Sequence, residues 1–221
     1  MKFLLTAFVL AGMAAGQEVN PDKRLEHATR ALRAFLDSES DVPRDLAGKA
    51  QCFVIVPHLV KGAFLFGGKY GRGFASCRRM NGGWSAPAAI AIEGGSFGPQ
   101  LGASATDLIM LVMNPTGMKR LLGDKFTLGG EVAVVAGPVG GSASANTDVL
   151  MNAEIISYSR AKGLFAGLSL EGATLRPDAG ENRRLYGHEM GNGEILSGKV
   201  PPSRGARAFV SLLNRRARKA R

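Results

Sequence analysis

The stretch KGAFLFGGKYGRGFASCRRMNGGWSAPAAIAIEGGSFGPQLGASATDLIMLVMN, residues 61–114, decides the fold. Short apolar runs of strand length alternate in it with single and paired glycines. Glycine permits positive φ and close backbone approach, so it marks turns, bulges and sharp bends. Apolar runs of this length between such breakers predict successive β-strands rather than helices. We therefore expect a strongly bent antiparallel sheet, barrel-like or sandwich-like.

Amphipathic helices are predicted on both sides of this sheet. Residues 20–22 (Asn-Pro-Asp) combine an N-cap, a first-turn proline and an acidic residue at the positive end of the helix dipole. The apolar spacing that follows predicts a helix ending near Asp37. Beyond the two prolines at 201–202, residues 206–213 carry a second apolar face. The fold class is therefore α+β, with N-terminal and C-terminal helices flanking the sheet.

Three local boundaries follow from the breaker residues. Pro57 is expected to end a strand that begins at Cys52. GGKYGRG, residues 67–73, is expected to form a bend between two strands. Residues 126–136 are expected to form one strand with a bulge at the glycine pair 129–130.

The composition points to anionic partners. The chain has 221 residues, which suits one domain, and its net charge is +10. Such a charge attracts phospholipid headgroups, lipopolysaccharide, nucleic acid or acidic proteins, although it also serves simple solubility. Aromatic and basic residues do not alternate as in single-strand binders, so no nucleic acid is expected as a partner in vivo.

The first residues, MKFLLTAFVLAGMAAGQ, have the pattern of a secretory signal peptide. Lys2 is followed by an apolar run and then by small residues, and we place the cut after Gly16. The run is too short to span a bilayer as a helix. We expect residues 1–16 to be removed, and the mature chain to be periplasmic or secreted without a transmembrane segment.

The cysteine and histidine content limits the chemistry. Cys52 and Cys77 lie in predicted strands, and export makes a disulfide permissible; two buried thiols are the alternative. The chain has three histidines and no CxxC, so neither a metal site nor a cofactor is expected.

Several motifs resemble the SYLF domain. They are VIVPHLVKGAFLFGGKYGRG, GGWSAP, GGSFGPQLGAS, DLIMLVMN, LGGEVAVVAGPVG and SYSRAKGLFAGLSLEG, in the family order. The resemblance covers residues 22–200, so we expect a SYLF-type domain over 17–200 and a basic amphipathic tail over 201–221. It implies lipid or actin binding, since the domain occurs in actin- and phosphoinositide-binding eukaryotic proteins and in exported bacterial ones. The family's N-terminal amphipathic region is associated with phosphoinositide binding.

Basic residues gather in three regions, and we predict that they form an anionic-lipid site. The alternatives are a docked first helix, a solvated bend and a docked last helix with a frayed end. The predicted lipid-binding residues are Lys23, Arg24, Arg30, Arg33, Lys61, Lys69, Arg72, Arg78, Arg79, Arg215, Arg216, Arg218 and Lys219. Apolar helix faces are expected to add an insertion term.

Two short motifs suggest enzymatic or nucleotide chemistry, and neither carries it. Residues 68–73 lack the order of a phosphate-binding P-loop. Residues 94–98 match G-x-S-x-G around Ser96, but the next residues start no helix, as a nucleophile elbow requires. We predict a non-enzymatic exported module that binds anionic phospholipid or lipopolysaccharide peripherally. A protein–protein interaction module is the first alternative, and a serine hydrolase using Ser96 is the second.

Overall fold

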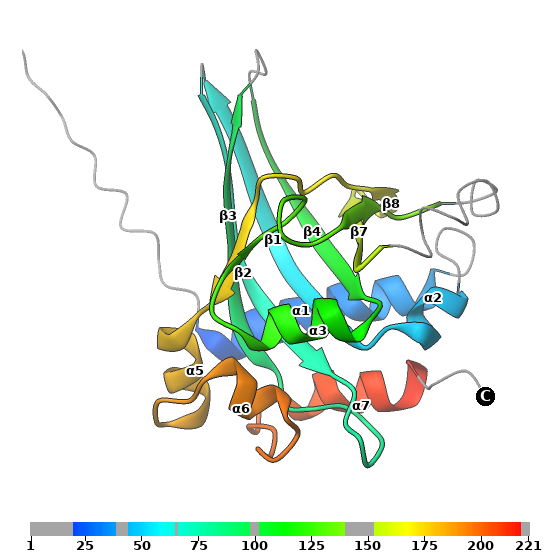
Figure 1. The fold of residues 1–221 in the computed structure, drawn as a ribbon, viewed down its shortest axis with the longest axis vertical. Coiled ribbons are helices and arrows are strands. Elements are labelled where there is room, and N and C mark those ends of the chain that lie inside the picture. Colours follow the sequence, from blue (N-terminus) through cyan, green and yellow to red (C-terminus); the bar gives the residue numbers. More distant parts are fainter. Residues whose placement is uncertain (1–19, 39–43, 65, 98–101, 140–152, 218–221) are drawn as a thin grey trace, which may run out of the picture.

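A computed structural model describes residues 20–38, 44–64, 66–97, 102–139 and 153–217. Its centre is a curled, mostly antiparallel sheet (Figure 1) with the strand order β5-β9-β3-β2-β1-β4-β7-β6, and β8 pairs with β7. Only β6 and β7 run parallel among the described strand pairs. The strands are β1 (Cys52–Phe64), β2 (Phe66–Cys77), β3 (Ala88–Phe97), β4 (Gly102–Val112), β5 (Phe126–Thr127), β6 (Val134–Ala136), β7 (Ile155–Ala161), β8 (Leu164–Gly167) and β9 (Thr174–Pro177).

The helices lie at one end of the long strands, whose other ends rise well beyond them (Figure 1). Asn20 caps α1 by accepting a hydrogen bond from the Asp22 amide, as its sequence predicts. The helices are α1 (Pro21–Asp37), α2 (Arg44–Lys49), α3 (Pro115–Leu122), α5 (Ala179–Tyr186), α6 (Asn192–Leu196) and α7 (Arg207–Arg216). The expected bent antiparallel sheet with N-terminal and C-terminal helices is confirmed.

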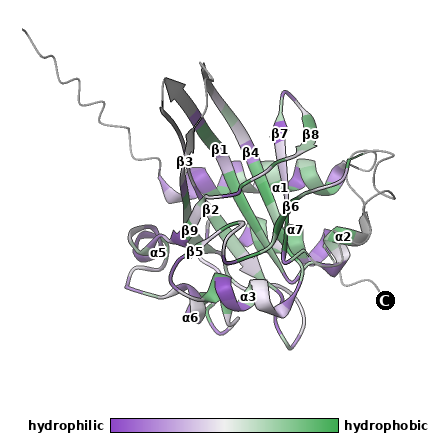
Figure 2. Cartoon of the chain, turned by 45° about the horizontal axis from the view of Figure 1, so that its top comes forward, coloured by the Kyte–Doolittle hydropathy of each residue, from purple (hydrophilic) through white to green (hydrophobic). Residues whose placement is uncertain are grey.

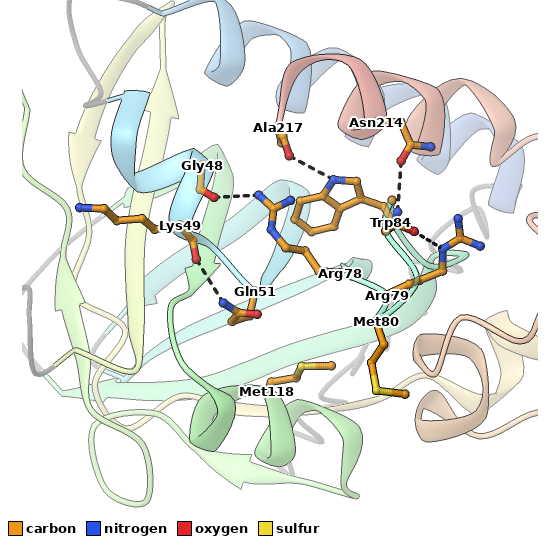
Figure 3. A pocket seen from close by; sticks show the side chains of 12 residues that line it. Gly48, Lys49, Gln51, Arg78, Arg79, Met80, Trp84, Met118, Asn214 and Ala217 are labelled. Atoms are coloured by element: carbon orange, nitrogen blue, oxygen red, sulfur yellow. Dashed lines mark hydrogen bonds between the residues drawn. The ribbon is translucent and has the colours of Figure 1, made fainter. Parts of the chain in front are cut away.

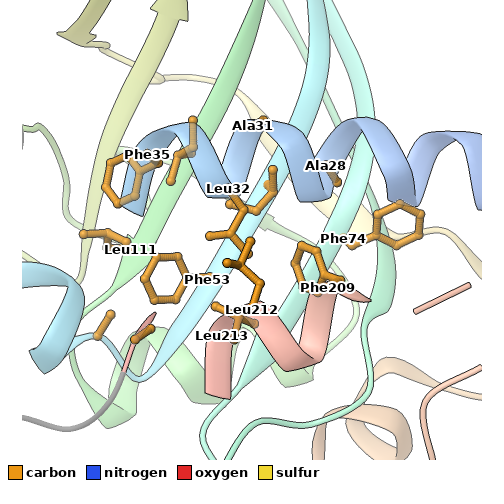
Figure 4. Packing of buried hydrophobic residues seen from close by; sticks show 14 of the residues in the cluster. Ala28, Ala31, Leu32, Phe35, Phe53, Phe74, Leu111, Phe209, Leu212 and Leu213 are labelled. Carbon is orange, nitrogen blue, oxygen red and sulfur yellow. The ribbon is translucent and has the colours of Figure 1, made fainter. Parts of the chain in front are cut away.

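Both faces of the sheet are covered by helices at the end of the long strands where the helices lie. Figure 2 shows that β1 and β4 are mostly hydrophobic where they are described. On one face, Leu32 and Phe35 of α1 and Phe209 of α7 pack against Phe53 and its neighbours (Figure 4). On the other face, a second cluster packs the remaining strand positions against α3 and α6. Alternate residues of each strand therefore enter different clusters.

The apolar faces of α1 and α7 are buried by this packing. Leu25, Leu32, Phe209 and Leu213 are fully buried. Exposing one such side chain costs about 1.5–3 kcal/mol. The expectation that these faces insert into a membrane is therefore wrong for the folded state, and the docked-helix alternatives hold. α7 lies beyond the predicted boundary at residue 200, yet its apolar residues belong to the same cluster as those of α1.

Pro57 does not end its strand. β1 continues through it to Phe64, and its pairing with β4 shifts register between Val56 and Leu59. His58 takes a positive φ of 53° there. Proline has no amide hydrogen to donate to a neighbouring strand. A bulge leaves one residue out of the hydrogen-bond ladder, so a central strand tolerates the proline at this one place.

GGKYGRG is not a bend. Residues 67–73 lie inside β2 and pair in continuous register with β3. A Cβ on Gly73 would lie 2.0 Å from the Ile55 carbonyl oxygen. These glycines therefore allow close approach of neighbouring backbone. The pairing of β1 with β2 ends at Phe64 and Phe66, which are register partners.

The expected strand over 126–136 is also wrong. It is divided into β5 and β6 by a turn at residues 129–131, where Gly129 has a φ of 81°. Positive φ at a glycine ends the strand here instead of bulging it.

Candidate functional site

The predicted basic residues do not form one site. Lys23, Arg30 and Arg33 lie exposed on α1, but Arg24 is buried. Lys61 and Lys69 lie on the long strands, Arg78 and Arg79 at their opposite end. Arg218 and Lys219 fall outside the described residues.

Arg24 and Arg72 belong to a buried ion network. Arg24 donates to Glu181 of α5, and Arg72 donates to Asp178 at 2.5 Å and to Glu181 at 3.4 Å. Arg184 completes the set by donating to Glu181 at 3.2 Å. Burial, followed by the charge of Arg72, lowers the pKa of Arg24. These arginines hold α1, β2 and α5 together and are not available to a lipid.

Four further arginines line the groove between α1 and α7. Arg30 and Arg33 contribute from α1, and Arg215 and Arg216 from α7. Arg216 donates to Asp37, and Arg30 lies 3.9 Å from Glu26. The groove is therefore only weakly cationic, because acidic residues of α1 offset part of its charge.

A local excess of positive charge surrounds an open cavity of about 830 Å³ beside Trp84 (Figure 3). Three cationic residues line it, and its lining contains no carboxylate. We call it the Trp84 cavity; its lining is Gly48, Lys49, Gln51, Arg78, Arg79, Met80, Gly82, Gly83, Trp84, Met118, Asn214 and Ala217.

Trp84 forms the fixed wall of the cavity. Its indole N–H donates to the Ala217 carbonyl at 3.3 Å, and its amide donates to Asn214 Oδ1 at 3.1 Å. Both acceptors come from the end of α7, so Trp84 joins that helix to the sheet. With 2% of its surface exposed, the indole packs in the core and is not an interfacial anchor.

Arg78 is held in place on this wall (Figure 3). Its guanidinium carbon lies 4.6 Å from the centre of the Trp84 ring. Its Nε donates to the Ala50 carbonyl at 2.8 Å, and Nη2 donates to the Gly48 carbonyl at 2.9 Å. A guanidinium has five N–H donors, and these two hydrogen bonds use two of them. Burial lowers the pKa of Arg78.

Residues 80–83 form a turn at the rim. Gly82 and Gly83 have φ values of 84° and 75°, which glycine adopts without strain. Arg79 Nε donates back to the Gly82 carbonyl at 3.1 Å, and Met80 is fully exposed. The rim therefore presents a cation next to an exposed apolar side chain.

A disulfide lies next to two residues of the cavity lining. Cys52 and Cys77 are direct partners across β1 and β2 and are bonded to each other. Gln51 and Arg78, the residues next to them, line the cavity, and the Arg78 amide donates to the Gln51 carbonyl at 2.8 Å. Sequence reasoning missed Lys49 and Asn214, since no local pattern brings α2 or α7 to this turn.

The position of Ser96 in the structure does not fit the serine-hydrolase alternative. Ser96 lies within β3, paired with Gly67, and not on a strand–turn–helix elbow. Among the described residues, no three acidic, histidine or cysteine side chains are grouped as metal ligands. Of the helices that the structure describes, none has the length and hydropathy of a membrane span.

Comparison with known proteins gives a family match. The family model "Ysc84: Las17-binding protein actin regulator" matches residues 93–216, more than half of the chain. "LAS seventeen-binding protein 3" of Saccharomyces cerevisiae (strain YJM789) is 35% identical over 179 residues, 80% of this chain and 39% of its own length. "SH3 domain-containing YSC84-like protein 1" of Homo sapiens is 30% identical over 202 residues, 88% of this chain and 59% of its own length. The chain thus spans 39% to 59% of the length of these curated relatives.

Proposed function

The chain belongs to the Ysc84 family, whose SYLF domain is generally a non-catalytic binding module, and we propose that it binds anionic phospholipid surfaces peripherally through the Trp84 cavity. The observation that carries this proposal is the cavity's composition, three cations with no carboxylate among its lining residues.

The chemistry of the cavity suits a phosphodiester headgroup. Arg78 offers a planar, oriented fork for phosphate oxygens, and Lys49 and Arg79 add exposed charge at the mouth. Met80 and Met118 are flexible and apolar, so they suit the glycerol and upper acyl region of a lipid. The binding is electrostatic in the main, because the helices' apolar faces are already buried.

We propose that the protein acts after export, periplasmic or secreted. The signal-peptide pattern of residues 1–16 supports this, and so does the Cys52–Cys77 disulfide, a bond that persists in oxidising compartments. The lipids met there include phosphatidylglycerol, cardiolipin and lipopolysaccharide. The mass of the protein recovered from its producing cells tests export: a chain beginning at Gln17 supports it, and one retaining Met1 contradicts it.

A protein partner is the second candidate. The family description names Las17 binding and actin regulation, and the yeast relative is named as a Las17-binding protein. A cationic cavity also accepts an acidic protein segment, since charge complementarity does not distinguish the two. Stoichiometric capture of one protein without any lipid binding would favour this candidate.

Charge-removing substitutions at the cavity mouth test the lipid proposal. Lys49→Gln with Arg79→Gln removes two cations and leaves Arg78, which anchors the backbone, in place. At about 1 kcal/mol for each basic residue near an anionic membrane, affinity for phosphatidylglycerol vesicles should fall about 30-fold. Lys119→Gln with Lys125→Gln is the matched control, because both lysines are exposed and lie outside the cavity lining. Equal loss in the two variants would contradict a site at the cavity.

A further inference from the structure

Two lysines face each other directly across the central strands. Lys61 of β1 and Lys69 of β2 are register partners. Like charges in this position destabilise a sheet, because partner Cβ atoms lie only about 5 Å apart. Burial lowers the pKa of both ammonium groups, and the charge of Lys69 lowers that of Lys61 further. The pair therefore carries a repulsion that an anion between the two groups would remove.

In contrast to the two lysines, the arginines of β2, β7 and β9 have carboxylate partners. Arg72 is paired with Asp178 and Glu181, Arg176 with Glu93 and Arg160 with Asp107. No described carboxylate lies within ion-pair distance of Lys61 or Lys69. The lysine pair is thus the exception among the cations of the long strands.

Small residues flank the lysines on their rung, and Ala173 packs over the glycine side, where a Cβ on Gly94 would lie 3.0 Å from its Cα. Gly94 of β3 is the register partner of Lys69, and Ser104 of β4 is that of Lys61. The row across the four strands therefore reads Gly-Lys-Lys-Ser, with one small residue on either side of the pair. Strand alternation puts Thr106 of β4 on the same face as Ser104, and its hydroxyl is buried without a partner in the described residues. Two ammonium groups and two hydroxyls form a donor set suited to phosphate oxygens.

Figure 1 shows that the long strands project beyond the helices at one end, and the pair lies toward the end of β1 and β2 at which Phe64 pairs with Phe66. It is three residues from the strand ends at Phe64 and Phe66, or about 10 Å along the strands. One interfacial layer of a bilayer is about 5–8 Å deep. Strand ends that reach the hydrocarbon boundary would thus hold the lysines near the phosphate level. Val60 and Tyr70, partners on the adjacent rung, are each 49% exposed and supply an apolar surface at this depth.

We propose that Lys61 and Lys69, with Ser104 and Thr106, form a second site, which binds the phosphate of an anionic phospholipid headgroup when the projecting strands meet a membrane end-on. This inference deepens the proposed lipid binding and rests on it for the class of ligand. The two sites are distinct, since the Trp84 cavity adjoins Arg78 at the far end of β2, nine residues from Lys69, or about 30 Å. Sites at opposite ends of the strands cannot both meet one flat membrane, so the protein should join two vesicles.

Vesicle binding and vesicle clustering together test the second site. The proteins are the wild type, Lys61→Gln/Lys69→Gln, Lys49→Gln/Arg79→Gln and the control Lys119→Gln/Lys125→Gln. Each is mixed with phosphatidylcholine vesicles with or without phosphatidylglycerol, at low salt, and followed by cosedimentation and light scattering. The wild type and the control should bind and cluster anionic vesicles. Lys61→Gln/Lys69→Gln should still bind vesicles through the cavity but should no longer cluster them. When the same two substitutions are added to Lys49→Gln/Arg79→Gln, the residual vesicle affinity should fall about 30-fold.

The outcomes separate the two proposals. A Lys61→Gln/Lys69→Gln protein that clusters vesicles like the wild type overturns the second site and leaves the cavity untouched. A Lys49→Gln/Arg79→Gln protein that binds like the wild type, while Lys61→Gln/Lys69→Gln loses binding, overturns the cavity and supports the lysine pair. A wild type that binds no anionic vesicle overturns both.

A measurement without lipid tests the repulsion itself. Lys69→Gln should raise the unfolding midpoint at low salt, and the gain should shrink as salt screens the pair. Lys119→Gln should leave the midpoint unchanged. An unchanged midpoint for Lys69→Gln as well would remove the repulsion on which the second site rests.

Discussion

Arg24 on α1 donates to Glu181 on α5, a residue 157 positions later, and both side chains are almost fully buried. Glu181 also accepts from Arg72 of β2 and Arg184 of α5. One carboxylate therefore accepts from arginines of three elements and holds α1 onto the sheet. Because of these contacts, Arg24 and Arg72 are not available to a lipid, although the sequence predicts both as lipid-binding residues.

Replacing Glu181 tests this network. Glu181→Gln keeps the shape but removes the buried charge to which Arg24 donates, while Arg72 keeps Asp178, so the unfolding free energy should fall by about 3–5 kcal/mol. Glu26→Gln, which removes the exposed partner of Arg30, should cost at most about 1 kcal/mol. Urea unfolding of both variants measures the difference. Similar small losses in the two would show that the buried network contributes little.

Reducing the disulfide should destabilise the fold. The bond joins residues separated by 25 positions, and the chain-entropy estimate for such a loop is about 3 kcal/mol. Cys52→Ser/Cys77→Ser should lower the unfolding midpoint, and dithiothreitol should lower that of the wild type but not of the variant. Two titratable thiols per unreduced, denatured chain would contradict the bond.

Gly73 is required by close packing of two strands. The Cβ of Gly73→Ala would lie 2.0 Å from the Ile55 carbonyl oxygen and 2.7 Å from Val56 Cα, so we expect a loss above about 3 kcal/mol or failure to fold. A Cβ on Gly95 of β3 meets nothing within 4 Å, so Gly95→Ala should change stability by about 1 kcal/mol or less. Thermal unfolding compares them, and equal midpoints would contradict the packing.

Stability should fall on acidification through His27. Its Nδ1 lies 3.0 Å from His58 Nε2, and burial, then the charges of Arg30 and His58, lowers its pKa below 6.5, against the opposing effects of Glu26 and Asp107. A base with a lowered pKa binds more protons when unfolded, so its contribution is complete above pH 6.5 and is lost as the pH falls toward the folded pKa. His27→Asn should therefore show a smaller loss of unfolding free energy on acidification. Parallel pH profiles for the two proteins would contradict this role.

The sequence predicts those features that depend on local signals. Asn20 and Asn114 precede prolines, and both cap helices as such pairs do. Glycines mislead because one residue type serves two purposes. Gly82 and Gly83 supply positive φ at a turn, whereas Gly73 supplies room for a neighbouring strand, and only the pairing of β1 with β2 distinguishes them.

The site is harder to predict because its residues meet through tertiary contacts. Arg24 looks like an exposed helix cation until α5 places Glu181 against it. Lys49 carries no motif, and it joins Arg78 only because α2 packs beside the start of β1. Composition predicts an anionic preference, which vesicle binding can test, but it does not assign that preference to a surface.

Salt-dependent cosedimentation of residues 17–221 with phosphatidylglycerol and phosphatidylcholine vesicles tests the central claim most directly. The account predicts binding to the anionic vesicles at low salt, progressive loss as salt rises, and no binding to the neutral ones. Truncation after Val200 is not a usable variant, because α7 is part of the core. Equal binding to both vesicle types, or binding to neither at low salt, would contradict the proposal that this protein recognises anionic membranes.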